Sequence, residues 1–325
     1  MLNTPILLIT FNRPDHVRRV LSEILKSNPT DIYVCQDGAR DGNERDKEKC
    51  EEVREVIREL TMEYAKENKP VALHTLYQER NLGCGAGPAV GIDWFFKNVE
   101  CGIVMEDDCL PHPDFFGYCE ELLDRYEKDE RVMFINATLY HDRWHPERSY
   151  GFSHYMVTGA WAAWRRTWDG FDLDLRDLDA RRVRKKVRRL TQSRSEANWW
   201  YFKTLEIQRD RMKKSYWDYQ MQILLFLKSA ITIHPAINLI SNIGFDAEGT
   251  HTLMNDGCGE RKVFPILPLN HPNVVCVNPR FDEDCFAKSQ RRDYWSEMVN
   301  YIYKRLYFSQ GIGHHLLMLY KKIKS

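Results

Sequence analysis

The sequence predicts an α/β fold with a mostly parallel central sheet and flanking helices, and two observations support this prediction. Short apolar runs alternate with segments of helical periodicity through the first 140 residues. Polar or charged residues follow several of these runs directly, as expected where strand ends meet at a ligand-binding edge. Strands that are separated by helices pair in parallel through right-handed crossovers.

Five short apolar segments in the first half have the length of strands. They are residues 5–11, 31–37, 71–77, 101–107 and 131–137. Four helices are expected between these strands. The first begins near Pro14, and the second is a long charged segment with Val53 and Ile57 on one face. The third follows the glycine-rich residues 81–91, and the fourth spans residues 112–129. This alternation gives the predicted sheet its parallel core.

The pattern changes beyond residue 140. Residues 141–175 are rich in aromatic side chains and are expected to be irregular, and residues 181–214 predict one or two basic helices. An apolar helix at 216–229, a strand at 230–235 and a glycine-containing loop at 238–252 follow. Because no repeat or low-complexity linker intervenes, we expect the second half to be a lobe packed on the first.

Composition excludes some classes of protein. The chain has 325 residues, and its 47 basic and 47 acidic residues balance, which argues against a general nucleic-acid binder. The nine cysteines form no CxxC pair, so reduced, mostly buried thiols are expected. No leader or segment of membrane-spanning length is apparent, and we expect a cytoplasmic protein.

Three acids, Glu106, Asp107 and Asp108, directly follow the apolar run GIVM. Neighbouring carboxylates repel one another by roughly 1 kcal/mol even in water, and by more where water is partly excluded. A divalent cation with a bound diphosphate would relieve this repulsion, because hard cations take oxygen ligands. An acidic turn on a solvated surface is the alternative.

Other strand ends carry further candidates. Asp37, after the second strand, either hydrogen-bonds a nucleobase or ribose or simply starts a loop. Arg13 and Arg80 suit phosphate oxygens, because guanidinium groups bind oxyanions in two-pronged geometry. The glycine-rich residues 81–91 either bring backbone amides to an anion or allow a helix to pack closely on the sheet.

The second half adds an acid, a histidine and several tryptophans. Asp218 begins the apolar helix and is either a favourable N-terminal acid or a general base. His251 is a loop histidine or a metal or phosphate ligand. Trp161, like its neighbours in GAWAAWRRTW, belongs to the core or to a sugar-stacking wall, and Trp217 is assigned to the same wall.

Together these segments resemble a known family. PILLITFNRPDHVRRVL, IYVCQDG, RNLGCGAGPAVGIDWFF and IVMEDDCLPHPDFF occur in the order and spacing of GT-A-fold glycosyltransferases. The chain looks most similar to N-acetylglucosaminyltransferase I-type enzymes and to bacterial nucleotide-diphospho-sugar transferases. GAWAAWRRTW, WDYQM and NLISNIGFDAEGTHT extend the resemblance over roughly residues 5–252.

The resemblance implies a metal-dependent, inverting transferase that uses a nucleotide-diphosphate sugar, with UDP as the expected nucleotide. Glu106 and Asp107 would face the donor sugar and ribose, and Asp108 would bind Mn²⁺ or Mg²⁺. Asp218 would be the catalytic base, and His251 would lie in a loop near the diphosphate. Asp37 would contact the base, and Arg13 and Arg80 would lie near base or diphosphate.

The same resemblance divides the chain into a nucleotide-sugar half at 1–140, an acceptor half at 141–255, and an extension of unknown role at 256–325. The acceptor would be a glycan, a lipid-linked sugar or a protein. In place of the bacterial tryptophan–glycine pair the chain has Gly159 and Ala160, which leaves acceptor and sugar open. A sugar nucleotidyltransferase and a non-catalytic nucleotide-sugar or glycan-binding relative are the rival functions. The apolar and basic residues 295–324 could lie on an acidic membrane as a peripheral contact, or dock on the protein itself.

Overall fold

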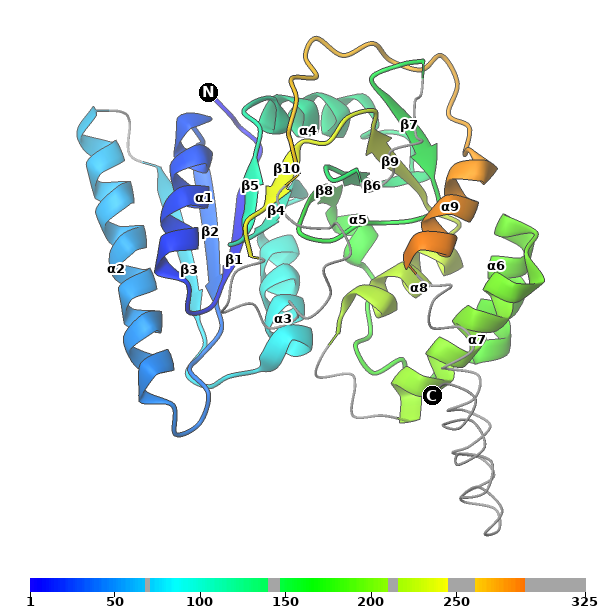
Figure 1. Cartoon of the computed structure of the whole chain (residues 1–325), viewed down its shortest axis with the longest axis horizontal. Coiled ribbons are helices and arrows are strands. Elements are labelled where there is room, and N and C mark those ends of the chain that lie inside the picture. The colour runs from blue at the N-terminus through cyan, green and yellow to red at the C-terminus, as the bar shows by residue number, and fades with distance from the viewer. Residues whose placement is uncertain (68–70, 140–146, 210–215, 245–260, 290–325) are drawn as a thin grey trace, which may run out of the picture.

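A computed structural model describes residues 1–67, 71–139, 147–209, 216–244 and 261–289. Its centre is an eight-stranded sheet in the order β3-β2-β1-β4-β8-β6-β9-β7 (Figure 1). The strands are β1 (Ile6–Thr10), β2 (Asp31–Gln36), β3 (Ala72–Tyr77), β4 (Cys101–Glu106), β6 (Val132–Asn136), β7 (Tyr150–Ser153), β8 (Ala160–Trp164) and β9 (Ile231–Pro235). Only β7 and β8 pair antiparallel with their neighbours, so the predicted α/β class with a mostly parallel sheet is confirmed.

Helices cover both faces of the sheet. They are α1 (Pro14–Lys26), α2 (Glu44–Glu67), α3 (Gly83–Asn98), α4 (Asp114–Arg125), α5 (Arg165–Trp168), α6 (Ala180–Thr191), α7 (Arg194–Arg209), α8 (Asp218–Lys228) and α9 (Pro279–Ser289). The apolar faces of α1, α2 and α4 pack on one side, and those of α3 and α8 on the other. The result is a three-layer α/β/α arrangement.

The strands of the first half form where the apolar runs predict them. β1, β2 and β4 have interiors that are entirely or almost entirely buried, as expected for central strands covered on both faces. The first helix starts with Pro14, whose fixed φ and missing N–H suit the first turn. Its buried residues recur at helical spacing: Val17, Val20, Leu21, Ile24 and Leu25.

One prediction for the second half is wrong. Residues 141–175 were expected to be irregular, but they contribute β7, β8 and the short helix α5. β8 lies between β4 and β6 and pairs antiparallel with both. All five of its residues, AWAAW, are buried. A strand buried on both faces shows no alternation of polar and apolar residues, and alanine is a weak indicator of strand structure.

A helical lobe follows the sheet. α6, α7, α8 and α9 share an apolar cluster that includes Val183, Trp199, Phe226 and Phe281. The segment before α9 also reaches the sheet, because Val277 forms a bridge with Phe152 of β7. Residues 261–289 of the predicted extension therefore pack on the rest of the chain.

A two-stranded ribbon completes the fold next to the sheet. β5 (Cys109–Pro111) pairs antiparallel with β10 (Ile240–Asn242). Through this pairing the chain around residue 243 lies beside the turn that follows β4. No helix in the described part of the chain combines the length and the apolar character that a membrane crossing requires.

Candidate active site

The polar segments that follow the parallel strands lie along one edge of the sheet. β1 lies between β2 and β4, with Thr10 paired to Gln36 and Ile9 paired to Glu106. β3 continues the row, with Tyr77 opposite Gln36. The residues that follow these strands therefore leave the sheet at the same level, at the edge where parallel sheets bind ligands.

The three acids after β4 sit in a tight turn between β4 and β5. Glu106 is the last residue of β4, and its backbone N–H donates to the carbonyl of Gly159 at 2.8 Å. Asp107 accepts a hydrogen bond from the backbone N–H of Phe11 at 3.2 Å. Asp108 pairs with the Arg13 guanidinium at 3.3 Å. The segment after β1 thus supplies donors to two of the three carboxylates.

The electrostatics of this turn are unfavourable in the absence of a cation. Burial raises the pKa of Glu106, and the charges on Asp108, Asp107 and Asp218 raise it further. Burial also raises the pKa of Asp107, together with Asp108, while Arg13 and the Phe11 amide oppose that rise. One guanidinium therefore does not neutralise the acidic turn.

Asp218 reaches the same site from the other half of the chain. It is the first residue of α8, and its charge acts on Glu106. Trp217 precedes the helix and packs near Trp161 and Trp168, with ring centroids 6.1 and 6.2 Å apart. These indoles fix the start of α8 against the sheet, so the fold brings the two predicted acidic segments together.

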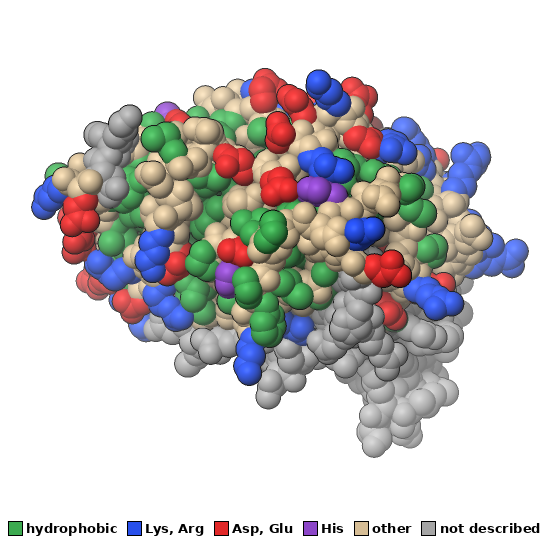
Figure 2. Space-filling model, turned by 90° about the horizontal axis from the view of Figure 1, so that it is seen from above, with side chains coloured by type: hydrophobic (Ala, Val, Ile, Leu, Met, Phe, Trp, Pro, Cys, Tyr) green, Lys and Arg blue, Asp and Glu red, His purple; other side chains and the backbone are tan. Residues whose placement is uncertain are grey.

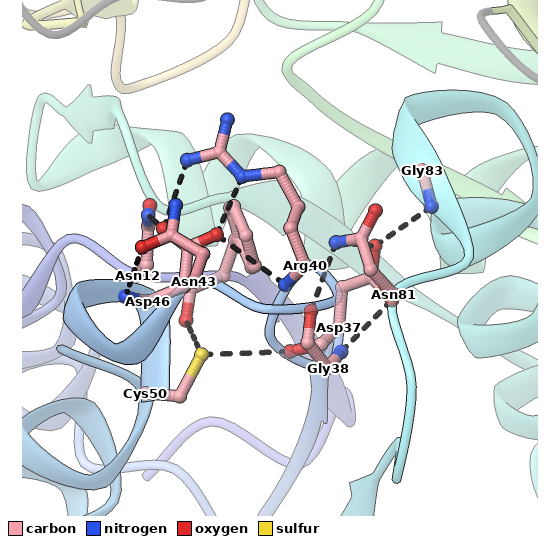
Figure 3. A network of polar contacts seen from close by, with 10 residues as sticks. Asn12, Asp37, Gly38, Arg40, Asn43, Asp46, Cys50, Asn81 and Gly83 are labelled. Carbon is pink, nitrogen blue, oxygen red and sulfur yellow. Dashed lines mark hydrogen bonds and ion pairs between the residues drawn. The ribbon is translucent and has the colours of Figure 1, made fainter. Parts of the chain in front are cut away.

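Asp37 accepts hydrogen bonds from the backbone at the start of α3. One carboxylate oxygen accepts from the backbone N–H groups of Gly38 and Leu82 at 2.9 and 2.8 Å. The other accepts from Gly83 N–H at 2.9 Å and from the Asn81 amide at 3.1 Å (Figure 3). Each oxygen already accepts two hydrogen bonds, so contact with a nucleobase, which stays a prediction, would require one of these bonds to be exchanged.

Arg80 lies beside this network. The loops after β2 and β3 press together so closely that a Cβ at Gly38 would lie 2.4 Å from the Arg80 carbonyl carbon. The Arg80 side chain is exposed. The structure therefore places Arg80 next to Asp37 at the binding edge, with its guanidinium available to solvent.

Another buried acid, Asp46, supports the edge, and no sequence pattern indicates it. Asp46 is 2% exposed on α2 and accepts from the Asn12 amide at 2.8 Å. It also accepts two hydrogen bonds from the Arg40 guanidinium, at 2.5 and 2.8 Å (Figure 3). These bonds lower the pKa of Asp46. In the sequence Asp46 belongs to a charged helical run that is typical of a solvated surface.

Gly244 packs directly against the acidic turn. A Cβ added there would lie 2.3 Å from a carboxylate oxygen of Asp108. The neighbouring Ile243 N–H donates to the Asp108 carbonyl at 2.8 Å, and the Ile243 carbonyl is 3.0 Å from the His16 ring. The segment that leads toward His251 therefore leaves the described structure beside Asp108. His251 itself lies outside the described residues.

The two residues assigned to a sugar wall are buried. Trp161 is 1% exposed and stacks on Phe134 at 4.7 Å between centroids, and Trp217 is 5% exposed. The sequence left core and wall as alternatives for Trp161, and this burial favours the core. In the described structure neither indole presents an open ring face to a ligand.

The donor set at the turn fits a hard divalent cation in its chemistry. Carboxylate oxygens are the ligands that Mn²⁺ and Mg²⁺ prefer. Three carboxylates meet in this turn, and within the described residues Arg13 is the cation that pairs with them. Within the described residues, no three His, Cys, Asp or Glu side chains are placed to hold a metal by themselves. A cation here would need further oxygens, such as those of a diphosphate.

Comparisons with family models and with curated proteins give no match. Among solved structures, S. aureus TarS 1-349 matches with a TM-score of 0.36 and 10% identity, over 51% of this chain and 48% of that one. The mannosyltransferase PcManGT from Pyrobaculum calidifontis, in complex with GDP-Man and Mn²⁺, matches with a TM-score of 0.38 and 12% identity, over 70% of each chain.

A UDP-glucose pyrophosphorylase complexed with UDP-glucose matches with a TM-score of 0.28 and 10% identity, over 51% of this chain and 78% of that one. The chain spans about half the length of the TarS fragment. Similarity at this level does not establish a shared function, so function has to be argued from the residues of the site.

Proposed function

We propose that this protein is a glycosyltransferase that moves a sugar from a nucleotide-diphosphate sugar, with UDP as the nucleotide, to an acceptor hydroxyl. The observation that carries the proposal is the acidic turn at Glu106–Asp108. It lies at the carboxyl edge of a parallel sheet, it pairs with Arg13, and its charge interacts with Asp218 from another element. An excess of negative charge at such an edge suits a site that is completed by a cation and a diphosphate.

The donor would lie along the ends of β1 to β4. Arg13 and Arg80 would contact its phosphates or base, Asp37 the base, and Glu106 and Asp107 the sugar and ribose. Asp108 would hold Mn²⁺ or Mg²⁺, with His251 as a further metal or phosphate ligand. When bound, such a cation neutralises charge on the diphosphate leaving group.

Asp218 would act on the acceptor, which would be a glycan, a lipid-linked sugar or a protein. The acceptor oxygen attacks the anomeric carbon as the bond from that carbon to the diphosphate breaks, and Asp218 takes the hydroxyl proton. Attack opposite to the leaving group inverts the anomeric configuration. A positioned base of this kind contributes on the order of 10²- to 10⁴-fold to the rate.

A comparison of two matched variants tests this division of roles. Binding of UDP-sugars is measured by calorimetry with and without Mn²⁺, and turnover by release of UDP. Asp108→Asn is expected to weaken Mn²⁺-dependent donor binding. Asp218→Asn is expected to keep that binding within about twofold and to lower turnover at least about a hundredfold. Asp124→Asn, an exposed acid on α4, is the control and leaves both quantities unchanged.

Three results would contradict the proposal. Donor binding and turnover that are indifferent to EDTA and to Asp108→Asn would remove the metal role. Full turnover in Asp218→Asn would place the base elsewhere. Release of pyrophosphate from a nucleoside triphosphate and a sugar phosphate, without sugar transfer, would identify a nucleotidyltransferase instead.

A further inference from the structure

Helix α6 carries a concentrated positive charge that the proposed reaction does not use. Its sequence, ARRVRKKVRRLT, contains seven Arg and Lys residues and no acid. Six of them are exposed, and they are Arg181, Arg182, Arg184, Lys185, Arg188 and Arg189. The chain as a whole has a formal net charge of zero, so this charge is a local feature.

Within the described residues, no acidic side chain neutralises these basic side chains. None of the seven forms an ion pair with an acidic side chain in the ranges that the structure describes. Of the acids just before the helix, Asp174 pairs with Arg176, and Asp179 accepts a hydrogen bond from the backbone N–H of Arg181. Asp177 is exposed and forms no ion pair with α6 in the described structure. α9 packs near α6 and carries Glu283 and Asp284, but neither pairs with it. Unpaired charge on one helix creates a field that attracts anions.

The apolar face of α6 is already occupied. Ala180, Val183 and Val187 are buried, and the two valines lie in the apolar cluster shared with α7, α8 and α9. The helix therefore cannot offer an apolar face to a groove in a partner protein, and it cannot turn that face into a lipid core. Among the described residues, the exposed face of α6 is basic, so we expect binding there to be electrostatic.

The shape and composition of this face favour a broad anionic surface. α6 lies at the outer end of the helical lobe (Figure 1), and basic side chains gather at the same end of the molecule in the view from above (Figure 2). The helix has 12 residues and is about 18 Å long. Exposed basic side chains spread over this length can contact a plane of anionic headgroups together.

The composition of α6 and of its surroundings also favours a membrane surface. The charge on α6 is one local patch on a chain whose formal net charge is zero, and general nucleic-acid binders usually carry an overall excess of basic residues. Arg184 lies over the partly buried ring of Tyr201 on α7, at 5.9 Å from the centroid. Tyrosine at the margin of a basic surface is typical of membrane interfaces, where one end of the ring is apolar and the other is wet.

We propose that the exposed basic face of α6 binds the surface of an anionic lipid bilayer. The contact is peripheral, since neither insertion nor a crossing helix is involved. α6 packs on α8, which begins at Asp218, so the contact would hold the acceptor side of the site close to the membrane. The binding itself does not depend on the proposed sugar transfer and can be tested without it.

Vesicle flotation of the full-length chain tests the proposal. Neutral vesicles consist of phosphatidylcholine alone, and anionic vesicles contain phosphatidylcholine with about 30% phosphatidylglycerol. The full-length chain is expected to bind only the anionic vesicles and to dissociate as salt rises, since the Debye length falls from about 8 Å at 0.15 M to about 3 Å at 1 M. Each basic side chain near the surface contributes about fivefold to binding, so removing three weakens it on the order of a hundredfold.

The test variant is Arg182→Gln/Lys185→Gln/Arg189→Gln, which neutralises one stripe on the exposed side of α6. Its control is Lys47→Gln/Arg58→Gln/Lys66→Gln, which removes three exposed charges from α2. Circular dichroism and melting temperature confirm that both variants fold. The α6 variant is expected to lose anionic vesicle binding, and the α2 variant to keep it within about twofold.

Three outcomes would overturn the proposal. Unchanged vesicle binding in the folded α6 variant would assign any membrane contact to another segment, including residues 295–324. Absence of binding by the full-length chain would remove the contact altogether. Binding of a 30-bp duplex DNA that is lost in the α6 variant, with no binding to vesicles, would make α6 a nucleic-acid surface.

Discussion

The acidic turn after β4 shows, at the scale of single residues, how a fold can hold a group in an unfavourable state. Glu106 and Asp107 have raised pKa values because they are buried beside Asp108, with Arg13 as an opposing charge on one side only. Such an arrangement is costly in the protein alone and is relieved by a bound cation. The turn is therefore better suited to a ligand than to stability.

Gly244→Ala is expected to disturb this turn without removing a carboxylate. A Cβ at this position would lie 2.3 Å from an Asp108 oxygen, so the carboxylate has to move. We expect Mn²⁺-dependent donor binding to weaken at least about tenfold, since about 1.4 kcal/mol of lost interaction corresponds to that factor. Calorimetry with UDP and Mn²⁺ measures the change.

Gly117→Ala is the matched control for this substitution. Its added Cβ would lie 2.9 Å from the end of the flexible Leu267 side chain, which can move, and alanine suits the interior of α4. Donor binding is expected to stay within about twofold. An equal loss of binding in both variants would show that the effect comes from general destabilisation and not from Asp108.

The residues of the site differ in how far the sequence could identify them. Glu106 to Asp108 and Asp37 follow apolar runs directly, so the rule about strand ends locates them. Asp46 and Gly244 give no such sign, because their roles depend on contacts with Asn12 and Asp108, far away in the sequence. Trp161 could be read as core or as wall, and only its burial between sheet and helix favours the core.

At the scale of elements, the parallel strands were predictable and the antiparallel insertion was not. β1, β2 and β4 are runs of branched apolar residues bounded by helices, which leaves little ambiguity. β8 is made of alanine and tryptophan, and its place between β4 and β6 depends on pairing with two strands distant in the chain. β8 forms because of its tertiary pairing, since the local strand preference of its residues does not predict a strand.

The helical lobe contains an element-scale feature with a pH dependence. Glu196 on α7 is 1% exposed and accepts a hydrogen bond from the Tyr155 hydroxyl. Burial raises the pKa of Glu196 from 4.5 to about 7, although Tyr155 and Thr191 oppose the rise and Asp282 and Glu283 add to it. The folded state therefore binds more protons than the unfolded state between these two pH values.

Glu196→Gln is expected to flatten the pH dependence of stability. In the native sequence the free energy of unfolding falls as pH rises from 4.5 to about 7. Over this pH interval the loss in free energy of unfolding is about 3 kcal/mol at most. Glutamine keeps an acceptor for Tyr155 without the charge, so the variant should be the more stable protein at pH 8. Urea unfolding at pH 5 and pH 8 measures this, with the exposed Glu59→Gln as control. A steeper loss at pH 8 in Glu196→Gln would contradict the assignment.

On the scale of the whole molecule, the halves of the chain join through buried polar contacts as well as through apolar packing. β7 forms the last strand of the sheet, and α9 lies against it and against α6. The sequence predicted a lobe packed on the first half. It left the role of residues 256–325 open, with membrane contact or docking on the protein as the alternatives for residues 295–324. Contacts between β7 and α9 span more than a hundred residues of sequence, which local patterns do not report.

Asp282 is the polar residue that attaches α9 to the sheet. It is 3% exposed, and one carboxylate oxygen accepts from the Ser153 hydroxyl at 2.5 Å and from the His154 backbone N–H at 3.1 Å. Burial raises the pKa of Asp282, while Ser153 and His154 oppose that rise. On folding, the Asp282 carboxyl group loses its contacts with water and gains two hydrogen bonds, one from Ser153 of β7 and one from the next residue, His154.

Two substitutions at Asp282 separate the hydrogen bonds from the charge. Asp282→Ala leaves two buried donors of β7 and the following residue unpaired, which costs about 1–3 kcal/mol of unfolding free energy. Asp282→Asn keeps an oxygen that accepts from both donors and removes the buried charge, so its stability should lie close to that of the native sequence. Thermal and urea unfolding followed by tryptophan fluorescence measure both variants. Equal destabilisation by alanine and asparagine would mean that the charge, and not the pair of hydrogen bonds, attaches α9. A native-like alanine variant would mean that apolar packing of Phe281 and Phe286 in the helical cluster is sufficient.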